Sequence, residues 1–359
     1  MASPVSYQRI LIVNIFGIGD VLFATPLARN IKLALPQARI DFVCNKRAEA
    51  VVKTNKDIQN VYVYERDDLV GMWKADKKQC VCSVWDLFRT VKNTRYDAMI
   101  DLSLSPQAGF FALMAGIRER IGFDYRGRGF WLTQKIKLAG YEGKPVADFY
   151  LDLLEKMGIR VQERKLLLDV QAEDHAWAEN FLRAQGVNSR DTLVACIPGG
   201  GASWGKAAGY KRWPAQRYAK LADKIIEKSH AKIILIGDAL EEILCEEVMQ
   251  QMVSPCIKVL GKTSLGQFAA LLSRCRLAIV NDGGPLHVAV AVGVPTVSIF
   301  GPVDEKVYGP YPSQGHHTVT ASVLCRPCYR RFRVAECSHR QCIKRISVDD
   351  VLSRIGEII

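Results

Sequence analysis

The residues with the clearest chemical use lie in the segment 280–302, VNDGGPLHVAVAVGVPTVSIFGP. An apolar strand is predicted to end at Val280, a turn with two glycines follows, and a helix of small residues then carries His287. A strand, a glycine turn and a helix start in this order gather backbone N–H groups at the positive end of a helix dipole, which favours phosphate binding. Asp282 and His287 stand where the pattern otherwise has apolar residues. The alternative is an ordinary βαβ unit in which Asp282 caps the helix and His287 packs in the core.

A second glycine-rich segment follows another predicted strand. It reads IPGGGASWGK over residues 197–206 and leads to Lys211 in the motif KRWP. Backbone amides, the hydroxyl of Ser203 and lysine charges can together hold a diphosphate. The segment is not a Walker A loop, because Lys206 is followed by Ala207 rather than Ser or Thr. The alternative is a flexible loop with solvated lysines.

Near the N-terminus, the apolar run RILIVNI (9–15) leads into the loop that contains Gly17, Gly19 and Asp20. A ligand of an open α/β sheet binds at the carboxyl ends of the strands, where this loop must lie, and the glycines let the backbone approach it closely. Leu22 breaks the G-x-G-x-x-G fingerprint, which disfavours dinucleotide binding. Asp20 is then either a carboxylate facing a substrate or a helix N-cap.

These segments need a scaffold of alternating strands and helices. Apolar strands are predicted at 9–15, 38–44, 61–65 and 97–103, and a second series begins at 192–198 and continues at 232–238 and 258–262. Helical segments lie between them, the pattern of doubly wound α/β domains. We predict two Rossmann-like domains facing across a cleft, residues 1–175 and 176–359, with an amphipathic helix at 347–359.

Composition limits the partners. A chain of 359 residues with a formal net charge of +12 favours an anionic partner, yet no nucleic-acid-binding motif is present. No run of about 18 uncharged apolar residues exists, so no membrane-spanning helix is expected. Eleven cysteines, mostly within predicted strands and helices, suit a reducing compartment. We therefore expect a cytoplasmic protein with no nucleic-acid partner.

Together these motifs resemble glycosyltransferase family 9, the ADP-heptose:lipopolysaccharide heptosyltransferases, whose fold is GT-B. The resemblance covers nearly the whole chain. Its most specific parts are D-x-G-x-x-H followed by A-x-G-x-P and F-G-P, and G-x-G-D with a proline six residues later. It implies an enzyme that uses a nucleotide-sugar donor, with the first domain binding the acceptor and the second the donor. GT-B chains often return to the first domain at the C-terminus, which we expect of the helix at 347–359.

The resemblance also implies roles for individual residues. Asp20 would be the base that deprotonates the acceptor hydroxyl, beside Gly17 and Gly19. Lys211 would bind the donor diphosphate, and Asp238, with Glu241 as a competitor for the role, would hold the adenosine. The other implied donor contacts are Ser203, Thr263, Asp282, Gly284 and His287. With one carboxylate base and no D-x-D pair to hold a metal, the expected reaction is an inverting transfer that needs neither metal nor cofactor.

The basic excess also has a use in this interpretation. Arg118, Arg120, Arg126 and Arg128 would meet the phosphates or carboxylates of a lipid-linked glycan acceptor, and the alternative is a solvated basic loop. Attachment to the inner face of the inner membrane would then be peripheral, electrostatic and weakened by salt.

Two other functions remain open from the sequence. The fold could serve a transferase with a UDP-, GDP- or dTDP-sugar donor, or a non-catalytic protein that binds a nucleotide sugar or a glycan; a dehydrogenase is the weakest candidate.

A cluster of cysteines lies near the C-terminus. Cys325, Cys328, Cys337 and Cys342 have the spacing C-x2-C-x8-C-x4-C, which allows either a structural zinc site with His339 as a spare ligand, or reduced thiols with an occasional disulfide.

Overall fold

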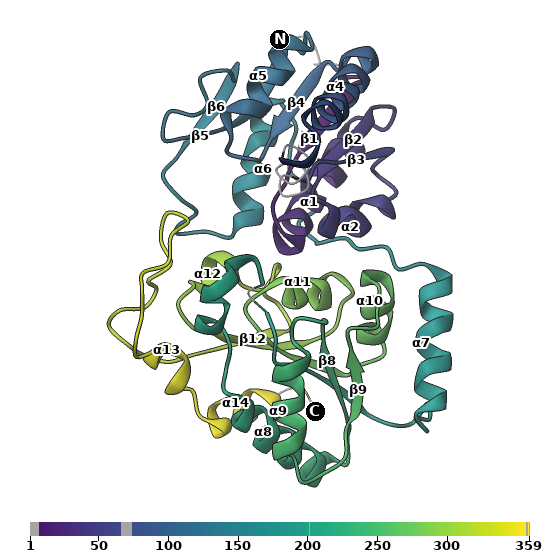
Figure 1. Ribbon diagram of the computed structural model, residues 1–359, viewed down its shortest axis with the longest axis vertical. Coiled ribbons are helices and arrows are strands. Elements are labelled where there is room, and N and C mark those ends of the chain that lie inside the picture. The colour runs from purple at the N-terminus through teal and green to yellow at the C-terminus, as the bar shows by residue number, and fades with distance from the viewer. Residues whose placement is uncertain (1–6, 66–73, 201, 357, 359) are drawn as a thin grey trace. The chain divides into compact units, whose positions relative to one another are not determined.

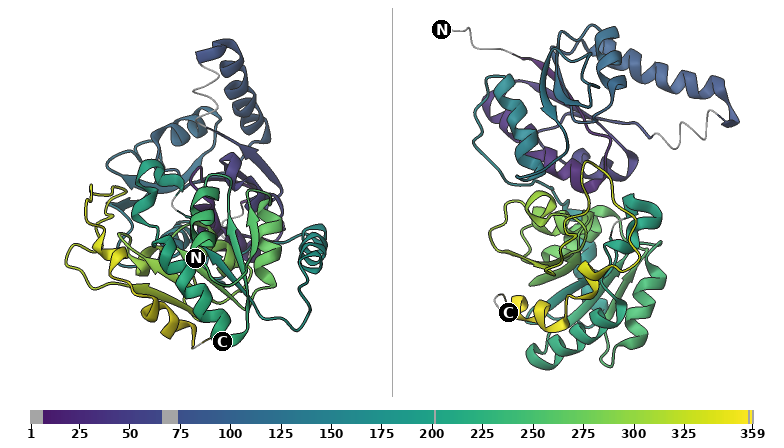
Figure 2. Two further views of the ribbon diagram at one scale, coloured as in Figure 1. Left: turned by 60° about the horizontal axis from the view of Figure 1, so that its bottom comes forward. Right: turned by 90° about the vertical axis from the view of Figure 1, so that its left-hand side faces the viewer.

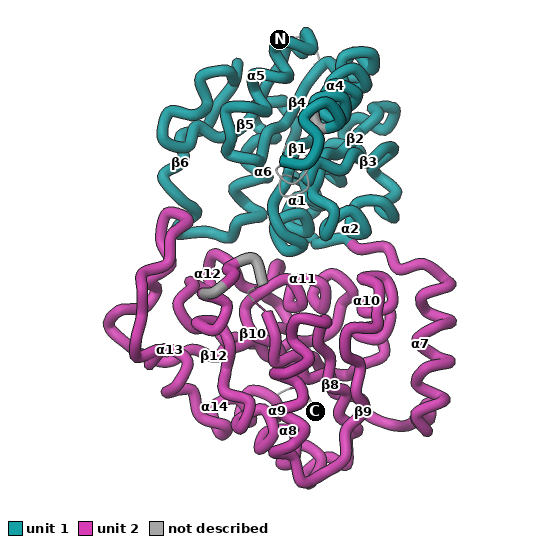
Figure 3. Tube along the Cα trace, in the orientation of Figure 1, with its two compact units in different colours: residues 1–167 teal, residues 168–359 magenta. Residues whose placement is uncertain are grey.

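The computed structural model describes residues 7–65, 74–200, 202–356 and 358. The chain divides into two compact units, residues 1–167 (unit 1) and 168–359 (unit 2), coloured separately in Figure 3. Each unit is built on one six-stranded parallel sheet. The predicted α/β class with two doubly wound domains is confirmed. The division falls before the helix that begins at Ala172, whereas the predicted boundary at 175 would cut that helix.

Unit 1 alternates strands and helices along the chain. Its strands are β1 (Arg9–Val13), β2 (Arg39–Cys44), β3 (Asn60–Val63), β4 (Ala98–Asp101), β5 (Glu119–Tyr125) and β6 (Gln134–Leu138). Its helices are α1 (Ile18–Ala34), the short 3-10 helix η1 (Lys46–Ala48), α2 (Glu49–Lys53), α4 (Lys77–Thr94), α5 (Pro106–Met114) and α6 (Val146–Lys156), labelled in Figure 1 where there is room. The strand order is β3-β2-β1-β4-β5-β6. The order reverses between β1 and β4, where sheets of this kind bind ligands.

Strand β1 shows why the central strands have continuous apolar sequences. Ile10 and Ile12 are fully buried, and Leu11 and Val13, which point to the opposite face, are buried as well. Leu11 and Val13 pack in a cluster with Met99 and Ala112 of α5. The sheet is therefore covered on both faces, as the apolar run predicted.

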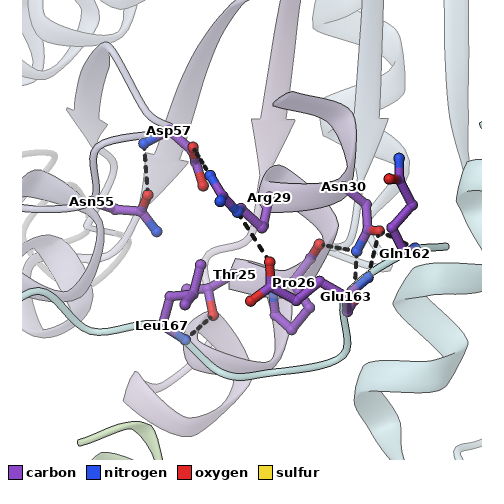
Figure 4. A network of polar contacts seen from close by, with 9 residues as sticks. All are labelled: Thr25, Pro26, Arg29, Asn30, Asn55, Asp57, Gln162, Glu163 and Leu167. Carbon is purple, nitrogen blue, oxygen red and sulfur yellow. Dashed lines mark hydrogen bonds and ion pairs between the residues drawn. The ribbon is translucent and has the colours of Figure 1, made fainter. Parts of the chain in front are cut away.

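Helix α1 contains Pro26, which cannot donate to the carbonyl of Leu22. The hydroxyl of Thr25 donates to that carbonyl instead, at 2.7 Å. The same hydroxyl accepts from the amide of Leu167, and the buried side chain of Asn30 bonds Gln162 and Glu163 (Figure 4). These bonds fasten the segment 162–167 to α1, and unit 1 ends there.

Unit 2 repeats the architecture. Its strands are β7 (Leu193–Ile197), β8 (Lys232–Gly237), β9 (Ile257–Leu260), β10 (Leu277–Asn281), β11 (Thr296–Phe300) and β12 (His316–Thr320). Its longer helices are α7 (Ala172–Ala184), α8 (Ala215–Ser229), α9 (Glu242–Gln251), α10 (Leu265–Ser273), α11 (Gly284–Ala291) and α14 (Val348–Ile355). Shorter ones are the 3-10 segment η2 (Ala202–Tyr210), α12 (Glu305–Tyr308) and α13 (Gln341–Lys344). The strand order, β12-β11-β10-β7-β8-β9, is that of unit 1, with the reversal between β7 and β10.

The helices of unit 2 divide between the two faces of its sheet. On one face, α8, α9 and α14 enclose a core that contains the fully buried Trp213. Elsewhere α7 packs beside α10, as Figure 1 shows. Val351 and Ile355 of α14 belong to the core of unit 2. The C-terminal helix thus packs within its own unit, and its expected return toward the first domain stays a prediction.

No helix in the part of the chain that the structure describes combines the length and apolar composition needed to cross a bilayer.

Candidate functional site

The donor residues implied by the sequence gather at one edge of the unit 2 sheet. Lys211 follows β7, Asp238 follows β8, Thr263 follows β9 and Asp282 follows β10. These four strands are neighbours in the order β10-β7-β8-β9, and all are parallel. Their carboxyl ends therefore meet at the same edge, around the reversal between β7 and β10, where a ligand is expected.

Lys211 and Asp282 form a buried ion pair at this edge. Lys211 Nζ lies 2.7 Å from Asp282 Oδ2, and the two side chains are 9% and 5% exposed. Lys211 Nζ also lies 4.0 Å from the ring centroid of Trp204, in a cation–π contact. A buried charge needs a partner, so these groups hold each other in one geometry. Asp282 does not cap α11, because the cap is Gly283; the capping interpretation of Asp282 is wrong.

His287 lies on α11 and is buried, as the alternative interpretation expected. Burial, followed by the positive charge of Lys211, lowers the pKa of His287 to about 3. The imidazole is therefore neutral near neutral pH, so it can offer a hydrogen bond to a ligand but no charge.

The glycine loop after β7 is organised by Glu241, for which the sequence suggested a different role. Glu241 is buried, and its Oε1 accepts from the amide of Gly200 at 2.6 Å. Arg212 Nη2 lies 3.5 Å from the same oxygen, and Arg212 Nε donates to the carbonyl of Gly200. A Cβ added to Gly199 would lie 2.0 Å from Glu241 Oε2, so a larger residue at this position would displace the Glu241 carboxylate.

Asn281 also organises this loop, and the sequence had assigned it no role. Its buried side chain donates to the carbonyls of Pro198 and Gly199 at 2.6 and 2.9 Å, and accepts from the amide of Trp213. It thereby joins the loop after β7 to the end of β10. A polar residue at the end of an apolar strand, directly before Asp282, was the feature of the sequence that could have indicated this role.

The remaining donor candidates occupy varied environments. Asp238 is exposed, and its Oδ1 accepts from the amide of Leu240 in the turn after β8. Thr263 is partly exposed two residues before α10, and Gly284 is the first residue of α11. The side chain of Ser203 lies outside the described residues.

In unit 1, the predicted loop lies at the carboxyl end of β1. Gly17 is the N-cap of α1, and its cap position makes no side-chain hydrogen bond, so the interpretation of Asp20 as the cap is wrong. Asp20 lies in the first turn, where a carboxylate suits the helix dipole. A Cβ added to Gly17 would be 3.8 Å from Asp20 Oδ2, which places the partly exposed carboxylate over the backbone of the loop. Asn14 and Asn45 fix the loop by bonds to the carbonyls of Asp20 and Phe16.

Arg120 differs from its basic neighbours. Its guanidinium donates to the carbonyls of Ile117 and Trp131, at 2.5 and 2.7 Å, and so holds the loop between β5 and β6. Arg118, Arg126 and Arg128 are exposed. The structure thus gives Arg120 a structural task, and its predicted contact with an acceptor remains a prediction.

The four cysteines of the predicted cluster are free thiols. Burial and the neighbouring cysteines raise the pKa of Cys342 to about 11. Across the ranges that the structure covers, no group of three or more His, Cys, Asp or Glu side chains is arranged to hold a metal ion.

Comparison with known proteins gives a consistent set of matches. The sequence model described as glycosyltransferase family 9 (heptosyltransferase) matches residues 84–339. Lipopolysaccharide heptosyltransferase 3 of Escherichia coli K12 is 23% identical over 297 residues, covering 82% of each chain. A family 9 glycosyl transferase from Veillonella parvula has a TM-score of 0.80 at 24% identity, covering 99% of this chain and 98% of that one. The Escherichia coli ADP-heptose heptosyltransferase II has a TM-score of 0.74 at 21% identity over 98% of both chains. The fold is that of GT-B heptosyltransferases.

Proposed function

This chain belongs to glycosyltransferase family 9, and we propose that it transfers a heptose from ADP-heptose to a lipopolysaccharide core or a related glycan. The observation that carries the proposal is the buried pair of Lys211 and Asp282, which stands where the unit 2 sheet reverses its order. A lysine, glycine-loop amides and a helix N-terminus at one edge suit a diphosphate.

The proposed reaction is a direct displacement. Asp20 takes the proton of the acceptor hydroxyl, whose oxygen attacks the anomeric carbon while the bond from that carbon to the diphosphate oxygen breaks. ADP leaves with the bonding electrons, and the configuration at the anomeric carbon inverts. The charge that develops on the departing diphosphate is met by Lys211 and by the amides at the start of α11. In this scheme protein groups fill the role that a divalent metal has in other transferases.

The other predicted residues have subordinate places in the proposal. His287, neutral because its pKa is lowered, donates or accepts one hydrogen bond to the donor. Gly284 lets the start of α11 approach the phosphates, Ser203 adds a hydroxyl, and Asp238 and Thr263 bound the nucleoside pocket. The acceptor, an anionic lipid-linked glycan, meets Gly17, Gly19 and the basic residues of unit 1. We place the enzyme in the cytoplasm, in peripheral contact with the inner membrane.

The proposal is tested by measuring transfer from ADP-heptose and from a panel of UDP-, GDP- and dTDP-sugars. ADP-heptose should be the preferred donor; preference for another nucleotide would assign the chain a different substrate, and no transfer from any would contradict an enzymatic role for this fold. Asp20→Asn should nearly abolish transfer while donor affinity stays within a few-fold, since the carboxylate meets the acceptor. Loss of donor binding in this variant would show that Asp20 has a structural role.

A matched pair of lysine variants tests the donor site. Lys211→Ala should weaken ADP binding by about tenfold or more, because it removes the charge that meets the diphosphate. Lys232→Ala is the control: Lys232 begins β8, at the amino edge of the same sheet, and is paired with Asp191. Equal ADP affinity in both variants would remove Lys211 from the donor site.

A further inference from the structure

Unit 1 carries a continuous surface of aromatic rings that the proposed reaction does not use. Rings from α4, α5 and the loop between β5 and β6 follow one another at centroid distances of 5.4, 6.3, 5.8, 5.5 and 5.0 Å. We call this surface the aromatic patch; in order, its members are Trp85, Phe88, Phe111, Phe110, Trp131 and Phe130.

The rings of the aromatic patch are accessible. Trp85 is 55% exposed, Phe130 59%, Phe111 44% and Phe110 40%. Val81, Leu113 and Met114 on the same two helices are exposed as well. A contiguous apolar surface of this kind on a folded chain marks a site of contact with a protein or a membrane.

Helix α4 shows how this surface is presented. None of the side chains that the structure describes on α4 is buried, although the helix has 18 residues. In the right-hand view of Figure 2, α4 extends away from the sheet of its own unit. Val91 packs against the core, so the C-terminal turns hold the helix to unit 1. The turns that carry Val81 and Trp85 make no comparable contribution to the core.

The charges around the aromatic patch select the partner. Four exposed basic residues accompany the rings on α4, Lys77, Lys78, Arg89 and Lys92, against one acidic residue, Asp86. Lys92 Nζ lies 5.9 Å from the ring centroid of Phe88. Arg126 and Arg128, in the loop that also carries Phe130, lie over the ring of Tyr125 at 5.0 and 5.7 Å from its centroid. Aromatic rings with lysine and arginine at their margin match the boundary between acyl chains and anionic headgroups.

We propose that the aromatic patch docks unit 1 on an anionic phospholipid bilayer, with Trp85 and Phe130 entering the headgroup region and the basic residues meeting lipid phosphates. This rests on the proposed function, because a lipid-linked acceptor is presented at such a surface. It adds an apolar contribution to the electrostatic attachment expected from the charge of the sequence. The two contributions differ in their response to salt, because screening weakens charge attraction and leaves apolar insertion in place.

The experiment measures co-flotation of the full chain with vesicles of phosphatidylethanolamine and phosphatidylglycerol, and with vesicles of phosphatidylcholine alone. It is run at about 0.1 M and about 0.5 M NaCl, where the Debye length falls from about 10 Å to below about 5 Å. The wild-type chain should prefer the anionic vesicles and keep measurable binding at the higher salt. Trp85→Ser with Phe130→Ser should lower the partition coefficient at the higher salt by about tenfold or more, because two exposed rings no longer leave water.

Two controls complete the design. Val253→Ser with Leu324→Ser removes two apolar side chains of unit 2 that are 93% and 108% exposed, and should bind vesicles as the wild type does. Lys78→Gln with Arg89→Gln and Lys92→Gln should lose binding mainly at the lower salt, where charge attraction is strongest.

The outcomes separate this proposal from the proposed function. Vesicle binding that is unchanged in the Trp85/Phe130 variant overturns the docking surface, as does absence of binding by the wild type. A variant that changes the oligomeric state without changing vesicle binding would assign the aromatic patch to a protein contact and also overturn it. The variant should still transfer heptose to a deacylated, water-soluble acceptor at the wild-type rate. A wild-type chain that docks on vesicles but transfers no sugar would contradict the proposed function alone.

Discussion

Replacing His287 should remove a defined part of the acid sensitivity of this protein. In the folded chain, burial and the charge of Lys211 lower the pKa of His287 to about 3. In the unfolded chain the pKa of a histidine is about 6.5. Between these values the unfolded chain binds a proton that the folded chain does not, so the free energy of unfolding falls as the pH falls. The stability linked to neutral His287 is fully present above about pH 6.5 and is progressively lost as the pH falls below it.

The magnitude follows from the two pKa values. A pH of about 5 is about 1.5 units below the histidine pKa of the unfolded chain. Protonation of the unfolded chain therefore lowers the free energy of unfolding by about 2 kcal/mol relative to pH 7. His287→Asn removes the titrating group and should lower stability at both pH values, because it disturbs a buried site. The fall between pH 7 and pH 5 should, however, be smaller than in the wild type by about 2 kcal/mol.

The assay is urea unfolding of the full chain at both pH values, followed by circular dichroism. Comparing the pH dependence of variant and wild type cancels the contributions of titrating groups that are distant from His287. His316→Gln is the comparison variant, since burial lowers the pKa of His316 to about 4 on β12 of the same unit. It should remove the contribution of His316 to the pH dependence of the free energy of unfolding, and the double variant should remove the contributions of both histidines. The reasoning is refuted if His287→Asn has the pH dependence of the wild type.

Two further substitutions test packing that positions the sites. Gly199→Ala should lower ADP affinity about tenfold and stability by about 1–3 kcal/mol, because the added Cβ would meet Glu241 at 2.0 Å. Gly209→Ala is the control, because there the added Cβ would lie 3.7 Å from Arg340 Nη1. Equal effects of the two substitutions would exclude the Glu241 contact as the cause. Asn30→Ala should lower the free energy of unfolding by about 2 kcal/mol or more in urea, because it removes the buried side chain that accepts from the amides of Gln162 and Glu163 (Figure 4). A loss below about 0.5 kcal/mol would show that this network does not hold the end of unit 1.

The central strands could be predicted because they are buried on both faces. The run from Ile10 to Val13 has no polar interruption, so its length and type follow from composition. The strands β5, β6 and β12 were not predicted. In β5, ERIGFDY, charged residues interrupt the buried stretch, whereas β6 and β12, QKIKL and HHTVT, lie at the edges of their sheets and contain few buried side chains. An edge strand is covered less completely, so its sequence carries less of the apolar signal.

The same distinction applies to the donor site. Lys211, Asp282 and His287 stand out because glycines and polar residues interrupt apolar strands at places where α/β sheets bind ligands. The tasks of Glu241 and Asn281 depend on hydrogen bonds to Gly200 and Pro198, which are 41 and 83 residues away in the chain. No periodicity within either segment records such a bond, because it exists only after the sheet has brought the loops together.

The aromatic patch was hidden for a related reason. A phenylalanine in an apolar helix is expected in a core, and the sequence of α5, PQAGFFALM, gives no sign that Phe110 and Phe111 face outward. Exposure is decided by which elements cover a face, and on this side of unit 1 the N-terminal turns of α4 do not close over the rings. Such a surface favours association, so a chain that keeps it exposed must either meet a partner there or tend to self-associate. Bordered by lysines and arginines, it fits a bilayer, and the salt dependence of vesicle binding decides between these outcomes.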